Sequence, residues 1–360
     1  MVIIADKLNH AIRAMYIEMN DMLVTTLAGT ATVAAFADGA ATSSSFNQPS
    51  DVHVVHLSIS GNDITLCLIA DGNNRRIRML DLTGTAPLSV YTLAGTGAAG
   101  AADGRGSVAS FNFPSALTAL PVSNVVWVAD MYNSVVRRLQ LEMPAHGNGG
   151  NGIGIAGVEC LVSTIRLFDS SRRLLQLLYP FGLALTPVGE SQALYISDQL
   201  QRRLLRADIS KVSSDFASNT QNVSALILSH NVHTCGVDEV DIAFPRGIAS
   251  TSTGELIVAE TDAARVRVVE HMVGARNWTA SISTIAPFVS ASTASADDIS
   301  KFSMKAPVAA LVLATSVGDI LLVSDGGAHV VRPLFVGTER LADAVQTTEQ
   351  APLPTCHGGV

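Results

Sequence analysis

The chain has little charge and few aromatic side chains. Charged residues make up 15% of its 360 residues and aromatic residues 5%, while hydrophobic residues reach 48%. Soluble domains usually carry about 25% charged residues. The formal net charge is -8, whereas proteins that bind phosphate backbones normally carry a basic excess and stack single-stranded bases on exposed rings. The composition therefore disfavours a nucleic-acid partner.

Several signals of other protein classes are absent from the sequence. The most apolar stretch, residues 307–323, is interrupted by Gly318 and Asp319, so we expect two strands and a turn there and no membrane-spanning helix. The glycine-rich segment 95–106 leads into a strand and not into a helix, which excludes a phosphate-binding loop. The first ten residues lack the features of a signal peptide. The compartment stays open: cytoplasmic for a complete chain, extracellular for one that has lost a signal.

Cysteines are few and widely spaced. None of the four, Cys67, Cys160, Cys235 and Cys356, forms a CxxC pair of the kind found in zinc sites. Cys67 lies within an apolar run, where we expect a buried thiol. Cys160 and Cys235 both fall in predicted connections between repeats, so a disulfide between them and two free thiols both stay open.

What the chain does contain is an internal repeat. Short apolar runs end in an acidic residue, here called the anchor, and these anchors are spaced by roughly 65 residues along the chain. The anchors are Asp6, Asp71, Asp130, Asp198, Glu260 and Asp325. The runs are rich in Val, Ile and Leu and are bounded by turn residues, which favours strands. The anchor is expected to cap its own hairpin, as Asp commonly does in turns.

An arginine follows most anchors at a fixed distance. It stands seven residues after the anchor as Arg13, Arg78, Arg137, Arg267 and Arg332, with Arg206 shifted by one in the fourth copy. The residue before it is apolar, so the two side chains point to opposite faces of a strand. We predict that the arginine pairs with carboxylates or carbonyls of a neighbouring repeat.

Four strands are predicted per repeat. A third run follows at 24–30, 90–96 and 152–158, and a further run that opens on proline begins each following unit, as in FNQPSDVHVV and FNFPSALTAL. Repeated four-stranded units are typical of a β-propeller. The spacing of Asp71, Asn74, Ile77 and Arg78, together with TLAGT, ADG and FNxP, resembles NHL repeats. That resemblance implies a propeller; members of the family bind RNA or proteins, and a minority are enzymes.

We therefore predict an all-β, six-bladed β-propeller of four-stranded antiparallel blades over residues 1–342. Blade one lacks its inner strand unless the C-terminal tail supplies it. The tail, residues 343–360, is either the outer strand of the last blade or disordered. Long connections at 30–47, 96–113, 158–179, 229–244 and 288–306 are predicted to share one face, and long loops on a rigid scaffold are common binding sites.

The predicted function is that of a non-catalytic scaffold. The loop-bearing face is expected to bind a protein or peptide, with the chain acting as a monomer without a cofactor. Its candidate residues are Arg75, Arg76, Arg202, Arg203, Arg265 and Asp103. A broken ring of basic residues at this face keeps an RNA-binding propeller as the first alternative, which the neighbouring loop acids disfavour.

The second alternative is a metal-dependent hydrolase or lyase resembling gluconolactonases or amidating lyases. Such enzymes hold a metal with several side chains from inner strands. The inner strands here offer few ligands except Asp51, His53 and His56, and the two histidines face opposite sides of a strand. His230, His233 and Cys235 are expected to lie in a solvated loop. The sequence thus predicts no catalytic residue and no metal site.

Overall fold

A computed structural model describes residues 1–17, 22–59, 62–84, 87–120, 123–142, 157–186, 192–210, 212, 220–229, 242–251, 254–271, 280–286, 307–315, 318–326 and 330–336. The chain divides into two compact units. The first comprises Met1–Leu183 and Lys211–Ser224, and the second Ala184–Ser210 and Ala225–Val360. Among the described residues, no helix is long and apolar enough to cross a membrane.

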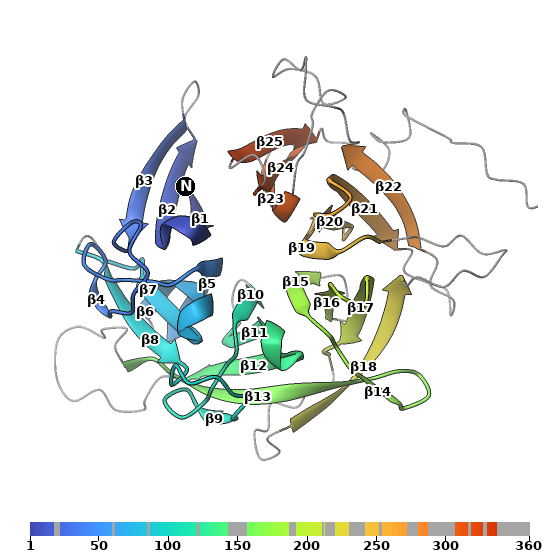
Figure 1. Cartoon of the computed structure of the whole chain (residues 1–360), viewed down its shortest axis with the longest axis horizontal. Coiled ribbons are helices and arrows are strands. Elements are labelled where there is room, and N and C mark those ends of the chain that lie inside the picture. Colours follow the sequence, from blue (N-terminus) through green and yellow to red (C-terminus); the bar gives the residue numbers. More distant parts are fainter. Residues whose placement is uncertain are drawn as a thin grey trace, which may run out of the picture. The chain divides into compact units, whose positions relative to one another are not determined.

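Antiparallel strands dominate the first unit (Figure 1). Its strands are β1 (Val2–Asp6), β2 (Ala11–Ile17), β3 (Met22–Ala28), β4 (Gly39–Ala40), β5 (Pro49–Ile59), β6 (Asn62–Asp71), β7 (Arg76–Asp81), β8 (Ser89–Ala94), β9 (Gly104–Arg105), β10 (Pro114–Ala119), β11 (Val125–Asp130), β12 (Val135–Glu142), β13 (Glu159–Phe168) and β14 (Leu174–Leu175). Three short 3-10 helices join antiparallel strands: η1 (Lys7–Asn9) joins β1 to β2, η2 (Gly72–Asn74) joins β6 to β7, and η3 (Met131–Asn133) joins β11 to β12.

The second unit repeats this arrangement. Strands β15 (Pro180–Thr186) and β18 (Thr220–Ser229) have residues in both units, and the others are β16 (Ala193–Asp198), β17 (Arg203–Asp208), β19 (Pro245–Ser250), β20 (Leu256–Glu260), β21 (Arg265–His271), β22 (Ala280–Ala286), β23 (Pro307–Thr315), β24 (Gly318–Asp325) and β25 (Val330–Val336). Each sheet is antiparallel between sequential strands, as in β19-β20-β21-β22. The all-β, propeller-like class predicted from the repeat is confirmed.

Apolar runs in the middle strands form the core of the first unit. Leu66, Leu68 and Met79 pack with Leu117 and Val128 between the second and third sheets. Ile12, Phe46 and Ile69 pack between the first and second sheets. Because both faces of β6 are covered, its sequence is a continuous apolar run and does not alternate with polar residues.

The outer strand of the third sheet is not where the sequence placed it. It is β13 at 159–168, within a stretch predicted as a connection, whereas the segment predicted as a strand, 152–158, lies before it and is mostly outside the described residues. Glycines weaken strands, and 152–158 carries three. By contrast β13 buries Cys160, Val162, Ile165 and Leu167.

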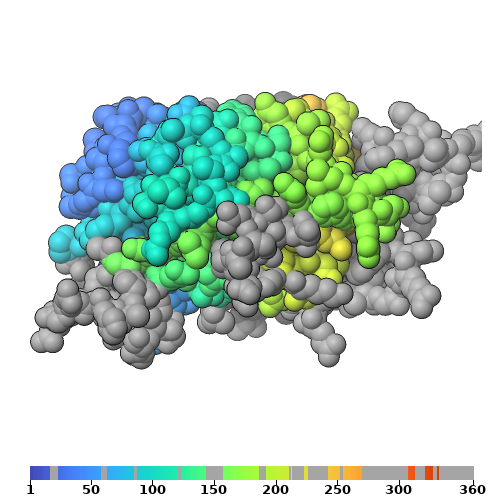
Figure 2. Space-filling model, turned by 90° about the horizontal axis from the view of Figure 1, so that it is seen from below, coloured from blue at the N-terminus to red at the C-terminus, as the bar shows by residue number. Residues whose placement is uncertain are grey.

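Strand β13 also pairs beyond its own sheet. Its second half is parallel to β18, from Thr164 opposite Thr220 to Phe168 opposite Ser224, and its first half receives β9. Figure 2 views this outer edge, where cyan residues before β10 lie on the same side as green residues of β13. The proposed C-terminal closure of blade one lies outside the described residues, and the first sheet has the three described strands β1, β2 and β3.

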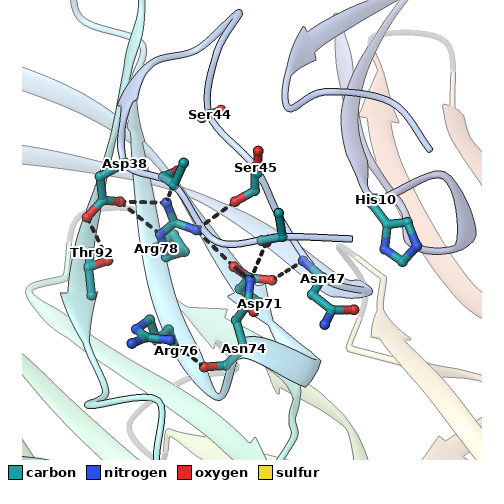
Figure 3. Close-up of polar contacts among 12 residues, drawn as sticks. His10, Asp38, Ser44, Ser45, Asn47, Asp71, Asn74, Arg76, Arg78 and Thr92 are labelled. Carbon is teal, nitrogen blue, oxygen red and sulfur yellow. Dashed lines mark hydrogen bonds and ion pairs between the residues drawn. The ribbon is translucent and has the colours of Figure 1, made fainter. Parts of the chain in front are cut away.

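The anchors of the first three repeats each accept several hydrogen bonds, and Figure 3 shows those of the second repeat. Asp71 accepts the Asn47 amide at 2.8 Å, the Asn74 side chain at 2.9 Å and Arg78 Nη1 at 2.9 Å. The Arg78 guanidinium also donates to Asp38 at 2.5 Å and to the Ala37 carbonyl at 2.7 Å. Asp71 and Arg78 have no exposed side-chain surface. We call this group the anchor clamp.

The anchor clamp corrects one prediction and refines another. The anchor makes no capping hydrogen bond to its own turn, so its role as a hairpin cap was predicted wrongly; it binds an arginine and an asparagine. The third repeat has the same design, with Asp130, Asn133, Arg137 and Asp103. In the later copies the partner can stand five residues after the anchor, as Arg203 does for Asp198 and Arg265 for Glu260.

Replacing Arg78 by methionine should lower the free energy of unfolding by about 3–5 kcal/mol, because it leaves the Asp71 carboxylate buried without its cation. Arg105→Met is the matched control, since the Arg105–Glu159 pair is 67% and 58% exposed and exposed pairs contribute ~0–1 kcal/mol. Urea unfolding at pH 7 measures both. Equal losses in the two variants would contradict the clamp's role.

Candidate active site

The basic residues predicted to bind a partner are used inside the molecule. Arg76 donates to the Asn74 carbonyl at 3.0 Å and to the Thr96 carbonyl at 2.9 Å, and its guanidinium lies 3.9 Å from the Phe36 ring centroid. Arg75 donates to the Gly97 carbonyl at 3.3 Å. These two arginines therefore hold the turn that follows β8.

The remaining candidates of the predicted binding face have similar roles. Arg203 pairs with Asp198 at 3.0 Å and Arg265 with Glu260 at 2.5 Å. Arg202 lies over the Phe244 ring at 4.9 Å. Asp103 accepts from Arg137 at 2.7 Å and from the Thr164 hydroxyl at 2.8 Å. Each of these side chains thus has a contact within the fold.

A different pair of ionisable side chains lies on β5. Asp51 and His53 are two residues apart and so share one face of the strand. Asp51 Oδ2 accepts the Leu117 amide at 2.7 Å, and its Oδ1 accepts the Val52 amide at 2.9 Å. His53 Nε2 lies 3.1 Å from both the amide nitrogen and the carbonyl oxygen of Ala119. The pair thus spans from β5 to the free edge of β10.

No other inner strand that the structure describes places such groups at these positions. Counted from the proline that opens each inner strand, the residues equivalent to Asp51 are Ala116, Gly182, Gly247 and Ala309, and those equivalent to His53 are Thr118, Ala184, Ala249 and Leu311. At Gly247 there is no space for a side chain, since a Cβ there would lie 2.5 Å from Ala309 Cα. The second repeat therefore departs from its own pattern to carry a carboxyl and an imidazole.

Burial changes the acidity of both groups. It raises the pKa of Asp51 from 3.8 to about 7, because the loss of water around the carboxylate outweighs the stabilising amides of Leu117 and Val52. Burial also lowers the pKa of His53, against a smaller opposite effect of its hydrogen bond to Ala119. Near neutral pH, the carboxyl is thus partly protonated and the imidazole is neutral.

The donor set does not fit a metal ion in the described part of the chain. There, no three His, Cys, Asp or Glu side chains gather closely enough to hold one. His56 is exposed and its Nδ1 lies 3.0 Å from the Thr65 hydroxyl, on the other side of β5. His230, His233 and Cys235 lie outside the described residues.

Both described cysteines are buried free thiols. Burial raises the pKa of Cys160 to about 12 and raises that of Cys67 as well, so neither is a reactive thiolate at neutral pH. Cys160 Sγ lies 3.7 Å from the Leu93 carbonyl. Its suggested disulfide with Cys235 stays a prediction, because Cys235 is not among the described residues.

No family model and no curated protein matches the chain. Solved structures with a similar fold include virginiamycin B lyase from Staphylococcus aureus (12% identity, 82% of this chain and 86% of that one, TM-score 0.36). A luciferin-regenerating enzyme is 11% identical over 94% of this chain and 82% of its own (TM-score 0.42). An auxiliary nutrient binding protein from Bacteroides ovatus is 10% identical over 80% of this chain and 59% of its own (TM-score 0.43).

The prediction of a non-catalytic module for a protein or peptide partner is corrected on these findings. Two of the three similar structures are named as enzymes, and the arginines chosen for the binding face are engaged within the fold. At such low identity and TM-score the comparisons assign no residue and no reaction.

The raised pKa of Asp51 predicts a pH dependence of stability. Between pH 4 and 7 the folded state holds a proton that the unfolded state has released, so this contribution is complete below pH 4 and is lost as pH rises through 7. Asp51→Asn should remove this dependence, which we expect to be on the order of 1–3 kcal/mol, less than ~4 kcal/mol for the full shift because Asp51 keeps some exposed surface.

Urea unfolding at pH 5 and pH 8 measures this effect. The loss of stability between the two pH values should be smaller in Asp51→Asn than in the wild type. Asp63→Asn, which changes an exposed carboxylate on the adjacent strand β6, should keep the wild-type dependence. Parallel pH profiles for the wild type and Asp51→Asn would show that the Asp51 pKa is normal.

Proposed function

We propose that the protein is a hydrolase or lyase for a small substrate and that Asp51 and His53 carry its acid–base chemistry. The observation that supports this most is the placement of a carboxyl and an imidazole at two positions that every other described inner strand fills with small or uncharged residues. Departures from a local structural rule are expected at functional sites.

A structural role alone accounts poorly for Asp51. The free edge of β10 gains two hydrogen-bond partners from Asp51 and His53, but the other inner strands are built without such side chains. Burying a carboxyl also costs stability unless it is fully compensated. A perturbed carboxyl beside a neutral imidazole is the arrangement that catalytic acids and bases use.

In the proposed reaction, the Asp51 carboxylate removes a proton from water as the water oxygen attacks an ester or lactone carbonyl. The protonated Asp51 then returns the proton to the leaving alcohol, so protons balance over the cycle. A pKa of about 7 suits both steps near neutral pH. The backbone amides of Leu117 and Val52 occupy two of its roughly four lone-pair positions, which leaves others for water.

His53 is assigned a positioning role in the same site. One edge of its ring is held by the Ala119 backbone in either tautomer, so the other ring nitrogen has a fixed direction. No step of this proposal passes through a metal ion. As its scaffold, we propose a six-bladed propeller of the NHL type in which the inner strands line the site.

Asp51→Asn should lower kcat/KM for an ester or lactone substrate by about 10²–10⁴-fold, the usual contribution of a general base. Hydrolysis of p-nitrophenyl acetate and δ-valerolactone is a suitable assay. Wild-type kcat/KM should rise with pH through an apparent pKa of about 7, since only the ionised carboxylate acts as the base. Asp63→Asn is the matched control, and it should retain wild-type rates.

Two results would contradict the proposal. One is an Asp51→Asn variant with wild-type activity; the other is a pH profile unchanged by that substitution in a protein that does hydrolyse these substrates. If neither ester nor lactone is turned over, a panel of lyase substrates with an acidic C–H should be tested in the same way, and failure of both would reject the assignment.

A further inference from the structure

Three aromatic side chains meet at the end of the third sheet where η3 lies. The ring centroids of Phe113 and Tyr132 are 5.1 Å apart at an interplanar angle of 39°, and those of Tyr132 and Tyr179 are 5.7 Å apart at 73°. Phe113 is 5% exposed, whereas Tyr132 is 50% exposed. Tyr132 thus presents much of its ring to solvent while its neighbours hold it in place.

The fold does not require an aromatic residue at this position. Tyr132 is the second residue after its anchor, and the equivalent residues are Leu8, Asn73, Leu200 and Asp262, all exposed. Its backbone amide donates to the Asn112 carbonyl at 3.0 Å, a bond that any residue but proline could make. The tyrosine side chain therefore does not serve the turn itself.

Phe113, which packs against Tyr132, is itself closely surrounded by other residues. A Cβ on Gly72 would lie 3.0 Å from Phe113 Cε2 and 3.0 Å from the Gln48 carbonyl, so glycine lets η2 approach the Phe113 ring. On another side, Lys7 Nζ lies 4.9 Å from the Phe113 ring centroid. Phe113 is thereby fixed between η1, η2 and η3, and it backs Tyr132. A rigid aromatic side chain binds a ligand with little loss of conformational entropy.

The aromatic cluster of Phe113, Tyr132 and Tyr179 and the proposed acid–base pair both lie next to strand β10. Phe113 directly precedes β10, and the amides that bind Asp51 and His53 belong to Leu117 and Ala119 of β10. At ~3.3 Å per residue, the backbone of Phe113 lies roughly 13 Å from that of Leu117 along the strand. A ligand that reaches from the aromatic cluster to Asp51 therefore needs a spacer of several bonds between its ring and its reacting group.

We propose that Tyr132 binds an aromatic ring of the substrate, so that the substrates of this protein are aryl-bearing esters, lactones or related compounds. This inference rests on the proposed function, because it takes the reacting group to lie at Asp51. Aromatic pairs stabilise by offset or edge-to-face contact beyond the area that they bury. The half-exposed Tyr132 ring offers such a contact.

Binding should be tested by calorimetry with N-phenylacetamide, which keeps the aromatic ring and replaces the ester by a stable amide. Tyr132→Ala should weaken its binding about five- to tenfold, and Tyr132→Phe should bind like the wild type. N-cyclohexylacetamide, which matches the size of the ligand without a π system, should bind more weakly to the wild type and respond less to Tyr132→Ala. Leu8→Ala, at the equivalent position of the first sheet, should change neither affinity.

The outcomes separate this inference from the proposed function. Normal binding of N-phenylacetamide to Tyr132→Ala, or an equal loss with Leu8→Ala, overturns the role of Tyr132. Tyr132-dependent binding of methyl β-glucoside in preference to N-phenylacetamide overturns the aromatic assignment. If methyl 8-phenyloctanoate, in which an alkyl chain separates the ring from the ester, is hydrolysed through Asp51 with a KM that Tyr132→Ala leaves unchanged, this inference fails alone. Tyr132-dependent binding without any turnover supports the ring site and counts against the proposed function.

Discussion

The buried ion pair between an anchor and its arginine is the interaction on which the rest of the first unit depends. In the second repeat, Asp71 at the end of β6 binds Arg78 of β7, and Arg78 binds Asp38 in the preceding connection. Asp38 in turn accepts the Thr92 hydroxyl of β8 at 2.9 Å. One guanidinium therefore links two middle strands, an outer strand and a long connection. Such a pair is tolerable inside a protein only when its donors are satisfied, and here backbone carbonyls complete the set.

In the second and third repeats, this clamp uses charged residues of the long connections to stabilise the fold. Long glycine- and alanine-rich connections are typical of adaptable binding loops. In the second and third repeats, however, a buried arginine holds the connection through an ion pair with Asp38 or Asp103. The arginines at the turns donate to carbonyls of the next connection. Asp51 and His53 lie instead on an inner strand, where they contact backbone groups of β5 and β10.

The sequence predicted those features that repeat. Periodic anchors, apolar runs and strand-opening prolines were enough for the all-β class, and Asp51, His53 and His56 stood out against ligand-poor inner strands. The sequence alone did not predict contacts between residues that are far apart along the chain. Asp51 binds an amide 66 residues away, which decides its pKa, and β13 is defined by pairing with β12, β9 and β18. Judged only as metal ligands, Asp51 and His53 looked insufficient, because spacing along one strand does not show what the neighbouring strand supplies.

A repeat protein gives an internal control for distinguishing function from structure. The same backbone is built several times, so a residue needed for folding should recur, as the anchor and its arginine do. Asp51, His53 and Tyr132 do not recur, and two of them carry an evident cost: Asp51 is a carboxyl largely removed from water, and Tyr132 exposes half of a large ring. Residues that destabilise the fold, or that expose a large apolar ring, without contributing to folding are expected at functional sites. All three contact β10 or Phe113, the residue before it, and a shared substrate site accounts for this common location.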